Sequence, residues 1–341
     1  MSEPLLLMLS AAHPATDVRI VAKEGAALAA AGFRLRHLAP RLSGAVPASL
    51  HGVALETFAA PRGWAGRLRG IPALARRAAA LRPAVIHAHE PDSWLAALLA
   101  ARRCGARVVL DVHEHYPSRL DPAVPALLRP LLAPLLRAAM RLACGAMAAR
   151  ADAVVLAKDG LAADYATARR SIAVRNYATP VEVTPRHHAA GPPVLLHLGA
   201  LTASRGALLL PALLARLPGA RLRLVGRFTD GSEAEFWDRA RALGLATRIE
   251  SLGWMEREAA VRVAAECDIG LVLFQPGVEN HRLALPHKLF DCMLAGLPVI
   301  VPDFAEEVCA VVREADCGLA VDVAEVPRIA AAVRALADPA R

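Results

Sequence analysis

The residues best suited to bind an anion lie in one stretch near the C-terminus, between positions 280 and 301. Pro286 suits the first position of a helix, because its fixed φ fits there and its missing N–H would have no partner in any case. A helix that begins there leaves the N–H groups of its first turn free, and Lys288 adds a positive charge beside them. The stretch therefore predicts a phosphate site formed by Lys288 and the backbone amides of His287, Lys288 and Leu289.

A carboxylate follows on the same predicted helix. Asp291 lies about one and a half turns from the helix start, so it could accept a hydrogen bond from a sugar hydroxyl next to a bound phosphate. We expect the helix to run from Pro286 to Ala295, with Gly296 just past its end and a buried strand over 297–301. An ordinary helix-to-strand connection with a solvated lysine explains the same pattern, so the stretch alone leaves both interpretations open.

A second group of polar residues follows two apolar strands in the first half of the chain. The strands are expected over 85–90 and 107–111, and they carry or lead into His87, His89, Glu90, Asp111, His113, Glu114 and His115. Polar side chains at the ends of neighbouring strands indicate a catalytic cleft, because the strand interiors here are apolar. For any single histidine, a satisfied hydrogen bond within a loop is the alternative. The spacing fits no metal-binding motif, so no metal site is predicted.

The run over 286–300 resembles the donor-binding segment of retaining glycosyltransferases of family four, which have the GT-B fold. It is most similar to the branch in which an Asn, here Asn280, precedes a Pro-x-Lys-Leu-Phe-acid run. The resemblance implies that Asp291 binds the nucleotide ribose. The family also has an earlier acid that holds the donor sugar in many relatives, and Leu283 takes its place here. Asn280 or Glu279 is the candidate replacement for that acid.

The loop after the strand expected over 194–198 resembles the same family. The family has a Gly-Arg…Lys-Gly pattern there, and its two cations hold the donor diphosphate. In this chain Ala200 replaces the first cation, Arg205 takes the place of the second, and Gly206 follows. The resemblance implies a diphosphate held by Arg205 and Lys288, and a guanidinium is a good bidentate phosphate ligand. It also places two residues beside the nucleotide, Gly226 and Arg227.

In the N-terminal half, the strand that ends in Asp-x-His-Glu is similar to a family-four strand. The resemblance implies that His113 contacts the donor sugar or the acceptor, with Asp111 and Glu114 as its catalytic neighbours. The first loop faces the cleft between domains in the family, so His13, Asp17 and Arg19 are candidates for acceptor or phosphate contact. His89 is a further acceptor-side candidate. For Asp17 the alternative is a purely local role, stabilising the dipole of the helix that follows.

These candidate residues need parallel sheets to bring strand ends together, and the chain predicts two such sheets. Apolar strands alternate with helices from residue 5 onward and again from residue 194 onward. The predicted fold class is α/β, and the resemblance implies GT-B: two doubly wound, Rossmann-like parallel-sheet domains facing each other across a cleft. We expect an N-terminal acceptor-side domain over 1–178, a proline-containing linker over 179–193 and a nucleotide-sugar-binding domain over 194–341.

Composition restricts the partners and the location. A net charge of +8 suits anionic partners, but no nucleic-acid-binding module is present, so nucleic acid is not expected. Six cysteines without a C-x-x-C pair, and no apparent signal peptide, suit a cytoplasmic protein. The apolar run 127–149 carries three arginines and two prolines, so no membrane span is expected. The arginine-rich run 62–82 is either the solvated face of a helix or a peripheral contact with an anionic inner membrane.

The function that combines these features is a retaining glycosyltransferase of polysaccharide, glycolipid or natural-product assembly. It would move a sugar from a UDP- or GDP-sugar to a glycan, lipid-linked or small-molecule acceptor. We expect no cofactor and no metal, because the two cations would neutralise the diphosphate. A non-catalytic GT-B-like binding subunit assisting an active partner is the alternative, since Leu283 and Ala200 replace functional groups. A nucleotide-sugar epimerase on the same fold would need an acid pair that this chain lacks.

Overall fold

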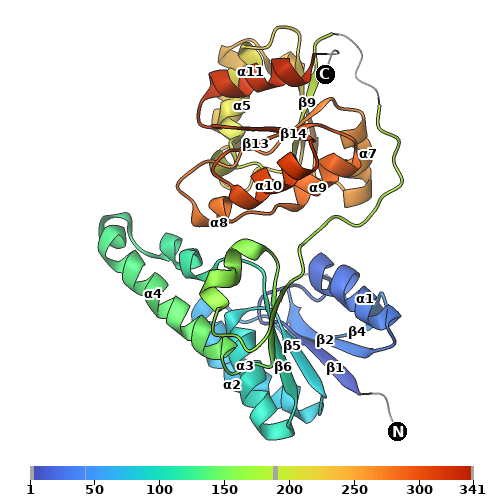
Figure 1. Cartoon of the computed structure of the whole chain (residues 1–341), viewed down its shortest axis with the longest axis vertical. Helices are drawn as coiled ribbons and strands as arrows, with labels where there is room; N and C mark the ends of the chain where they lie inside the picture. The colour runs from blue at the N-terminus through green and yellow to red at the C-terminus, as the bar shows by residue number, and fades with distance from the viewer. Residues whose placement is uncertain (1–3, 43, 187–190, 339–341) are drawn as a thin grey trace. The chain divides into compact units, whose positions relative to one another are not determined.

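The computed structural model describes residues 4–42, 44–186 and 191–338, and its ribbon is shown in Figure 1. The chain divides into two compact units, Met1–Arg175 and Asn176–Arg341. Each unit has its own sheet and its own buried core. The prediction of two Rossmann-like parallel-sheet domains is therefore confirmed.

The N-terminal unit contains an eight-stranded sheet in the order β3-β4-β2-β1-β5-β6-β7-β8. Its strand pairs are parallel except β3 with β4, which is antiparallel. All five residues of β1 are buried, as expected of a central parallel strand covered on both faces. The strands are β1 Leu5–Leu9, β2 Arg34–Arg41, β3 Ser49–Leu50, β4 Val53–Ala59, β5 Val85–Ala88, β6 Arg107–Val112, β7 Ala153–Leu156 and β8 Ser171–Ala173.

Helices cover both faces of this sheet. Right-handed connections place η1 and α1, which join β1 to β2, on the opposite face from α2 and α3, as Figure 1 shows. The first helical segment begins with a π-helical stretch, η1, and the segment after β7 is a 3₁₀ helix, η4. The helices are η1 Val18–Gly25, α1 Ala26–Ala30, α2 Gly63–Ala80, α3 Pro91–Cys104, η2 Tyr116–Ala123, η3 Ala126–Leu128, α4 Arg129–Ala148 and η4 Asp159–Tyr165.

The C-terminal unit contains a six-stranded, fully parallel sheet in the order β11-β10-β9-β12-β13-β14. Two apolar clusters cover it: α5, α6 and α11 contribute to one, and α7, α9 and α10 to the other. The strands are β9 Val194–Leu198, β10 Arg221–Val225, β11 Ile249–Gly253, β12 Ile269–Leu271, β13 Val299–Pro302 and β14 Gly318–Val321. The helices are η5 Ala203–Arg205, η6 Ala207–Leu209, α5 Leu210–Ala215, α6 Glu233–Ala242, η7 Ala246–Arg248, α7 Arg257–Ala265, α8 Glu279–Arg282, α9 His287–Leu294, α10 Glu306–Glu314 and α11 Val326–Leu336.

The stretch 280–301 forms the predicted helix, turn and strand. Pro286 is the N-cap residue of α9 rather than its first helical residue, with an extended ψ of 141°. The residue before the helix can be a proline because its N–H is not needed for an intrahelical bond. Gly296 follows the helix with a φ of +73°, the left-handed conformation that glycine adopts readily.

Candidate functional site

Two cations of the C-terminal unit lie over one aromatic ring. The Nζ of Lys288, in the first turn of α9, lies 5.4 Å from the centre of the Phe274 ring. The guanidinium of Arg205, at the end of η5, lies 5.9 Å from the same centre. Lys288 is only 8% exposed, and within the described chain its Nζ has no hydrogen-bond partner. The structure thus brings together the two residues predicted to hold a diphosphate.

The charge of Lys288 is poorly stabilised in the protein alone. Burial lowers the pKa of Lys288, the nearby Arg205 lowers it further, and the result is about 7. A buried cation next to another cation is unfavourable unless an anion accompanies them. An anion placed between the two groups would therefore gain both charges and relieve their repulsion.

Glycines allow the loops of this site to approach closely. Gly206 has a φ of +81°, and a Cβ there would lie 2.6 Å from the carbonyl oxygen of Leu273. Gly226 has a φ of +146°, and a Cβ there would lie 2.0 Å from the carbonyl oxygen of Gly199. The chain segments after β9, β10 and β12 thus pack backbone against backbone, where no side chain fits. Next to Gly226, Arg227 lies 5.8 Å over the exposed Trp254 ring.

The remaining predicted donor residues of α8 and α9 are more heavily engaged than expected. The N–H of Leu289 is not free, because it donates to the carbonyl of Pro286 at 3.0 Å. Asp291 is buried, and its carboxylate lies 2.9 Å from Arg257 Nε and 2.9 Å from His287 Nδ1. Asn280 lies in the short helix α8. The ribose contact of Asp291 stays a prediction, and it would have to share the carboxylate with Arg257.

Three residues at this site were not predicted. Arg205 and Lys288 both lie over the ring of Phe274. The ring of His281 stacks on the same ring, with 4.8 Å between the ring centres and an interplanar angle of 16°. His197 on β9 is fully buried, and burial followed by the charge of Lys288 lowers its pKa well below the ordinary value. The only sequence signal for Phe274 is an aromatic residue just after a strand, which many folds share.

In the N-terminal unit, Asp111 at the end of β6 is the centre of a buried polar cluster. Its Oδ2 accepts hydrogen bonds from His89 Nδ1 at 3.0 Å and from His113 Nε2 at 2.7 Å. Its Oδ1 accepts from the guanidinium of Arg19 at 3.0 Å. Burial alone would raise the pKa of Asp111, but His113, His89 and Arg19 together bring it well below its usual range. The predicted neighbours His89, Asp111 and His113 are thus held as one hydrogen-bonded unit.

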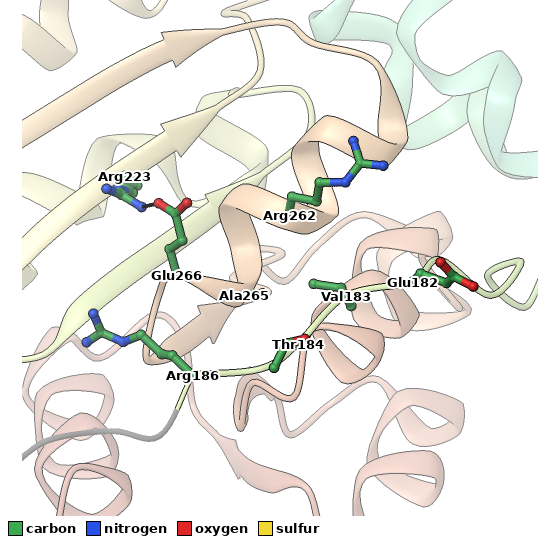
Figure 2. Close-up of a pocket in the computed structure, with 8 residues that line it drawn as sticks. All are labelled: Glu182, Val183, Thr184, Arg186, Arg223, Arg262, Ala265 and Glu266. Carbon is green, nitrogen blue, oxygen red and sulfur yellow. Dashed lines mark hydrogen bonds and ion pairs between the residues drawn. The ribbon is translucent and has the colours of Figure 1, made fainter.

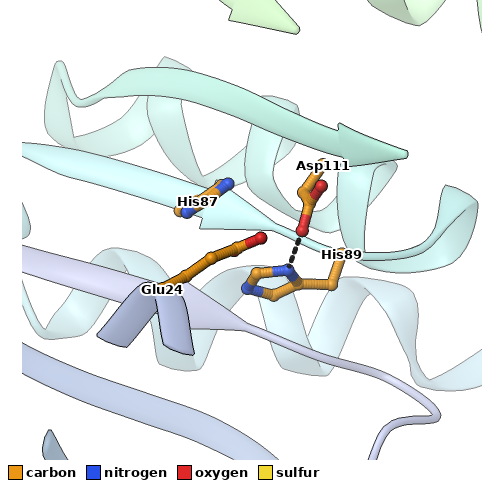
Figure 3. A group of neighbouring side chains, drawn as sticks. All are labelled: Glu24, His87, His89 and Asp111. Atoms are coloured by element: carbon orange, nitrogen blue, oxygen red, sulfur yellow. Dashed lines mark hydrogen bonds and ion pairs between the residues drawn. The ribbon is translucent and has the colours of Figure 1, made fainter. Parts of the chain in front are cut away.

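Figure 3 shows Asp111 and His89 with two further members of the cluster, Glu24 and His87. Ligand-type atoms of these four residues lie within 4.8 Å of one another, which is a geometry that could hold a metal ion. Positive charge is already present, however, because Arg19 contacts the carboxylates of Glu24 at 2.9 Å and Asp111 at 3.0 Å. Burial, followed by the neighbouring Asp111, raises the pKa of Glu24 well above its usual value. Two carboxyl groups can therefore lie side by side in the cluster, because Arg19 contacts both and the raised pKa of Glu24 favours its protonated form.

Glu90, the N-cap residue of α3, fixes the loop that follows β1. Its carboxylate accepts hydrogen bonds from the backbone N–H groups of Ala11, Ala12 and His13 at 3.0, 3.0 and 2.8 Å. This places the His13 ring 4.6 Å from the His113 ring. Sequence reasoning noted Glu90 as a polar strand end but gave it no role. Because the partners are backbone groups, no residue pattern in the loop could reveal the contact.

Two other predicted residues of this unit, Asp17 and Glu114, have different surroundings. Asp17 has the local role that was the alternative for it, because its carboxylate accepts a hydrogen bond from the N–H of Ile20 as the N-cap of η1. It also pairs with His13 at 3.3 Å, and its acceptor-side role stays a prediction. Burial by itself would raise the pKa of Asp17, but these contacts outweigh it and lower the pKa to about 2. Glu114, expected beside His113, pairs instead with Arg119, and both side chains are well exposed.

A groove of about 840 Å³ lies elsewhere in the C-terminal unit (Figure 2) and contains none of the predicted residues. Its cations are paired, since Arg186 donates to Asp268 at 2.9 Å and Arg223 donates to Glu266 at 2.8 Å. The groove therefore lacks a buried, unpartnered cation comparable to Lys288 among its described lining residues.

Comparison with known proteins agrees with this geometry. Residues 18–175 match the family model described as Glycosyltransferase Family 4, and residues 192–338 match the one described as Glycosyl transferases group 1. A search of curated protein sequences finds no match.

Solved structures share the fold at low sequence identity. HepE from Anabaena in complex with UDP is 17% identical with a TM-score of 0.70, and the match covers 99% of this chain and 91% of that one. Sucrose-phosphate synthase from Thermosynechococcus elongatus is 18% identical with a TM-score of 0.75, over 99% and 91% of the two chains. The lipopolysaccharide outer core galactosyltransferase WaaB is 14% identical with a TM-score of 0.68, over 97% and 90%. With both halves matched by glycosyltransferase family models and the fold shared with these structures, the chain belongs to the GT-B glycosyltransferases of the family-four type.

Proposed function

We propose that the protein is a retaining glycosyltransferase that uses a nucleotide-diphosphate sugar and needs no metal ion at the diphosphate. The observation that carries this proposal is the buried Lys288 ammonium, which lies beside Arg205 without a hydrogen-bond partner in the described residues. The charges of Lys288 and Arg205 complement those of a nucleoside diphosphate, and they can stabilise it as a leaving group. A resident divalent cation would add to their repulsion.

The chemical step follows from this charge arrangement. The bond between the sugar anomeric carbon and the diphosphate oxygen breaks, and the electron pair goes to the diphosphate, where Arg205 and Lys288 stabilise it. The acceptor hydroxyl forms the new bond on the same face of the sugar and gives its proton to the departing diphosphate. Configuration is thereby retained without a carboxylate nucleophile. We assign His113, which Asp111 orients through a 2.7 Å hydrogen bond, to contact the reacting sugar or the acceptor hydroxyl.

The first donors to test are uridine nucleotides. HepE of Anabaena has been solved in complex with UDP, with UDP and glucose, and with UDP-glucose. Thermal unfolding of the full chain would be measured with UDP, GDP, ADP, dTDP and their common sugars, each with and without EDTA. We expect a nucleotide-specific rise in Tm that EDTA does not abolish and that Lys288→Ala or Arg205→Ala removes. A Tm unchanged by every nucleotide would reject the donor site.

A binding subunit without turnover is the second candidate. It is favoured by Leu283, which is buried and apolar where the family has an acid, and by Ala200 in place of a cation. Sugar release from the bound donor, measured with and without candidate glycan, lipid-linked and small-molecule acceptors, separates the two. The transferase predicts acceptor-dependent release of the nucleoside diphosphate, whereas the binding subunit predicts a Tm shift with no release.

A further inference from the structure

Helix α4 of the N-terminal unit has its large apolar side chains on the outside. Leu131, Leu135 and Leu142 are 72%, 68% and 75% exposed, and Leu127 just before the helix is 90% exposed. The side of α4 that packs on the unit is made of small residues, Ala133, Cys144 and Ala148. This is the reverse of a helix on a soluble domain, where leucines face the core.

The exposed leucines form one continuous face. Residues 127, 131, 135 and 142 fall on one side of a helix, because positions three, four or seven apart share a face. A second row runs beside them, and its members are each at least 41% exposed: Leu128, Leu132 and Leu136. We call these seven residues the leucine face. A contiguous apolar surface of this kind marks a site of interaction in a soluble protein.

The charged residues of α4 and of its flanking turns are all arginines, and one of them, Arg141, pairs with Asp164 of η4 at 3.1 Å. Residues 122–151 contain four arginines, at 129, 137, 141 and 150, and no aspartate or glutamate. Pairing this helix with the same helix of a second copy would bring arginines toward arginines. An anionic lipid surface, by contrast, offers acyl chains to the leucines and headgroup charge to the arginines.

The topology fixes how such a helix can meet a bilayer. By length and hydropathy α4 could cross a membrane, with a mean hydropathy of 1.4 in its most apolar window. However, α4 lies in the connection from β6 to β7, and these two strands are hydrogen-bonded parallel neighbours in one sheet. A spanning α4 would place adjacent strands on opposite sides of the membrane. The helix must therefore lie in the plane of the interface, and Figure 1 shows it along the outer side of its unit.

We propose that the leucine face of α4 inserts into the headgroup region of an anionic membrane and holds the enzyme there as a peripheral protein. The leucines supply the apolar contact, and the arginines at the edges of the face bind lipid phosphates. The inference is independent of the proposed donor site, because it uses only residues of α4 and its preceding turn. It moves the expected membrane contact from the arginine-rich run 62–82 to α4.

The test is co-sedimentation of the full chain with vesicles of phosphatidylcholine alone or mixed with phosphatidylglycerol. We expect binding to the mixed vesicles that falls with added salt, and little binding to neutral ones. The combined variant Leu131→Gln, Leu135→Gln and Leu142→Gln is expected to lower partitioning by about 10-fold or more, because three inserted side chains are lost. The matched control carries Leu68→Gln, Leu95→Gln and Leu243→Gln, three leucines that are exposed outside α4.

Each variant would first be checked for an unchanged Tm, which these surface substitutions should preserve. The proposal is overturned if wild type ignores both vesicle types, or if the α4 variant and the control bind equally well. It is also overturned if wild type sediments as a dimer without lipid and the α4 variant as a monomer, since the leucine face would then be covered by a second copy. Because the vesicle assay uses no nucleotide, its outcomes can be interpreted even if the protein binds no nucleotide.

Discussion

The ammonium group of Lys288 lies 5.4 Å from the centre of the Phe274 ring, and in the described chain it has no hydrogen-bond partner. A ring face stabilises a cation only weakly compared with the water that burial removes. The native fold therefore holds a charge at a position where it is costly, and the cost is recovered when an anion binds.

We predict that Lys288→Met stabilises the free protein. The folded-state pKa of Lys288 is about 7 against an ordinary 10.5, so the unfolded chain binds more protons between these values. Wild-type stability should thus rise with pH across this window, whereas the variant lacks this dependence. Below pH 7 the variant should gain on the order of 2–4 kcal/mol, shrinking toward zero near pH 10. Thermal unfolding of both proteins from about pH 6 to pH 10 measures it, and a pH-independent difference would contradict it.

Binding of a nucleoside diphosphate should be coupled to proton uptake. A bound diphosphate raises the pKa of Lys288 from about 7, so above pH 7 each binding event takes up a proton and affinity falls as pH rises. Isothermal titration calorimetry in buffers of different ionisation enthalpy counts this proton. Lys288→Arg is the matched control, because a guanidinium remains charged and should bind without uptake. An equal proton count in both proteins would show that another group is responsible.

Substitutions of His113 and His115, two histidines of one loop, should have different effects on catalysis and on stability. His113 bonds to the central Asp111 at 2.7 Å, whereas His115 bonds to Ser118 at 2.9 Å and lies 3.0 Å from Asp164. We expect His113→Gln to lower kcat by about 10²-fold with a smaller change in KM for the donor, as for loss of one polar contact to a developing charge. His115→Gln should lower Tm but keep kcat. Steady-state kinetics with the identified acceptor decides, and equal losses of kcat would remove His113 from its assigned role.

Gly206 and Gly231 have the same φ of +81° but different surroundings. A Cβ at Gly206 would lie 2.6 Å from the carbonyl oxygen of Leu273, whereas nothing lies within 4 Å of one at Gly231. Gly231→Ala should cost only the left-handed backbone strain, about 1–2 kcal/mol. Gly206→Ala should cost a further 1–3 kcal/mol or so from overpacking and should weaken nucleotide binding, because Arg205 would move. Both effects are measured by the Tm and the nucleotide affinity of the two variants. Equal losses in both variants would mean that the loop at Gly206 can shift to accommodate a Cβ without cost.

The spacing of residues was sufficient to predict the parts of the fold that depend on local pattern. The strands β5, β6, β9 and β13 and the helix α9 were predicted to within a few residues, because apolar strands and periodic helices need only neighbours in the chain to be recognised. The two-residue strand β3 was missed, because so short an element depends on tertiary contacts rather than on periodicity. The apolar run 127–149 was recognised, but the sequence did not show that several of its leucines face outward.

For the candidate site as well, local pattern placed some residues, whereas other contacts are known only from the structure. Local pattern was enough to place Asp111 and His113 at the end of a strand, Arg205 in the loop after a strand and Lys288 in the first turn of a helix. The packed structure was needed to show that Phe274 lies beneath both cations, that Arg19 and Glu24 complete the Asp111 cluster, and that Asp291 already pairs with Arg257. Those contacts join residues far apart in the chain, and their energies come from burial and charge, which exist only once the sheets have packed.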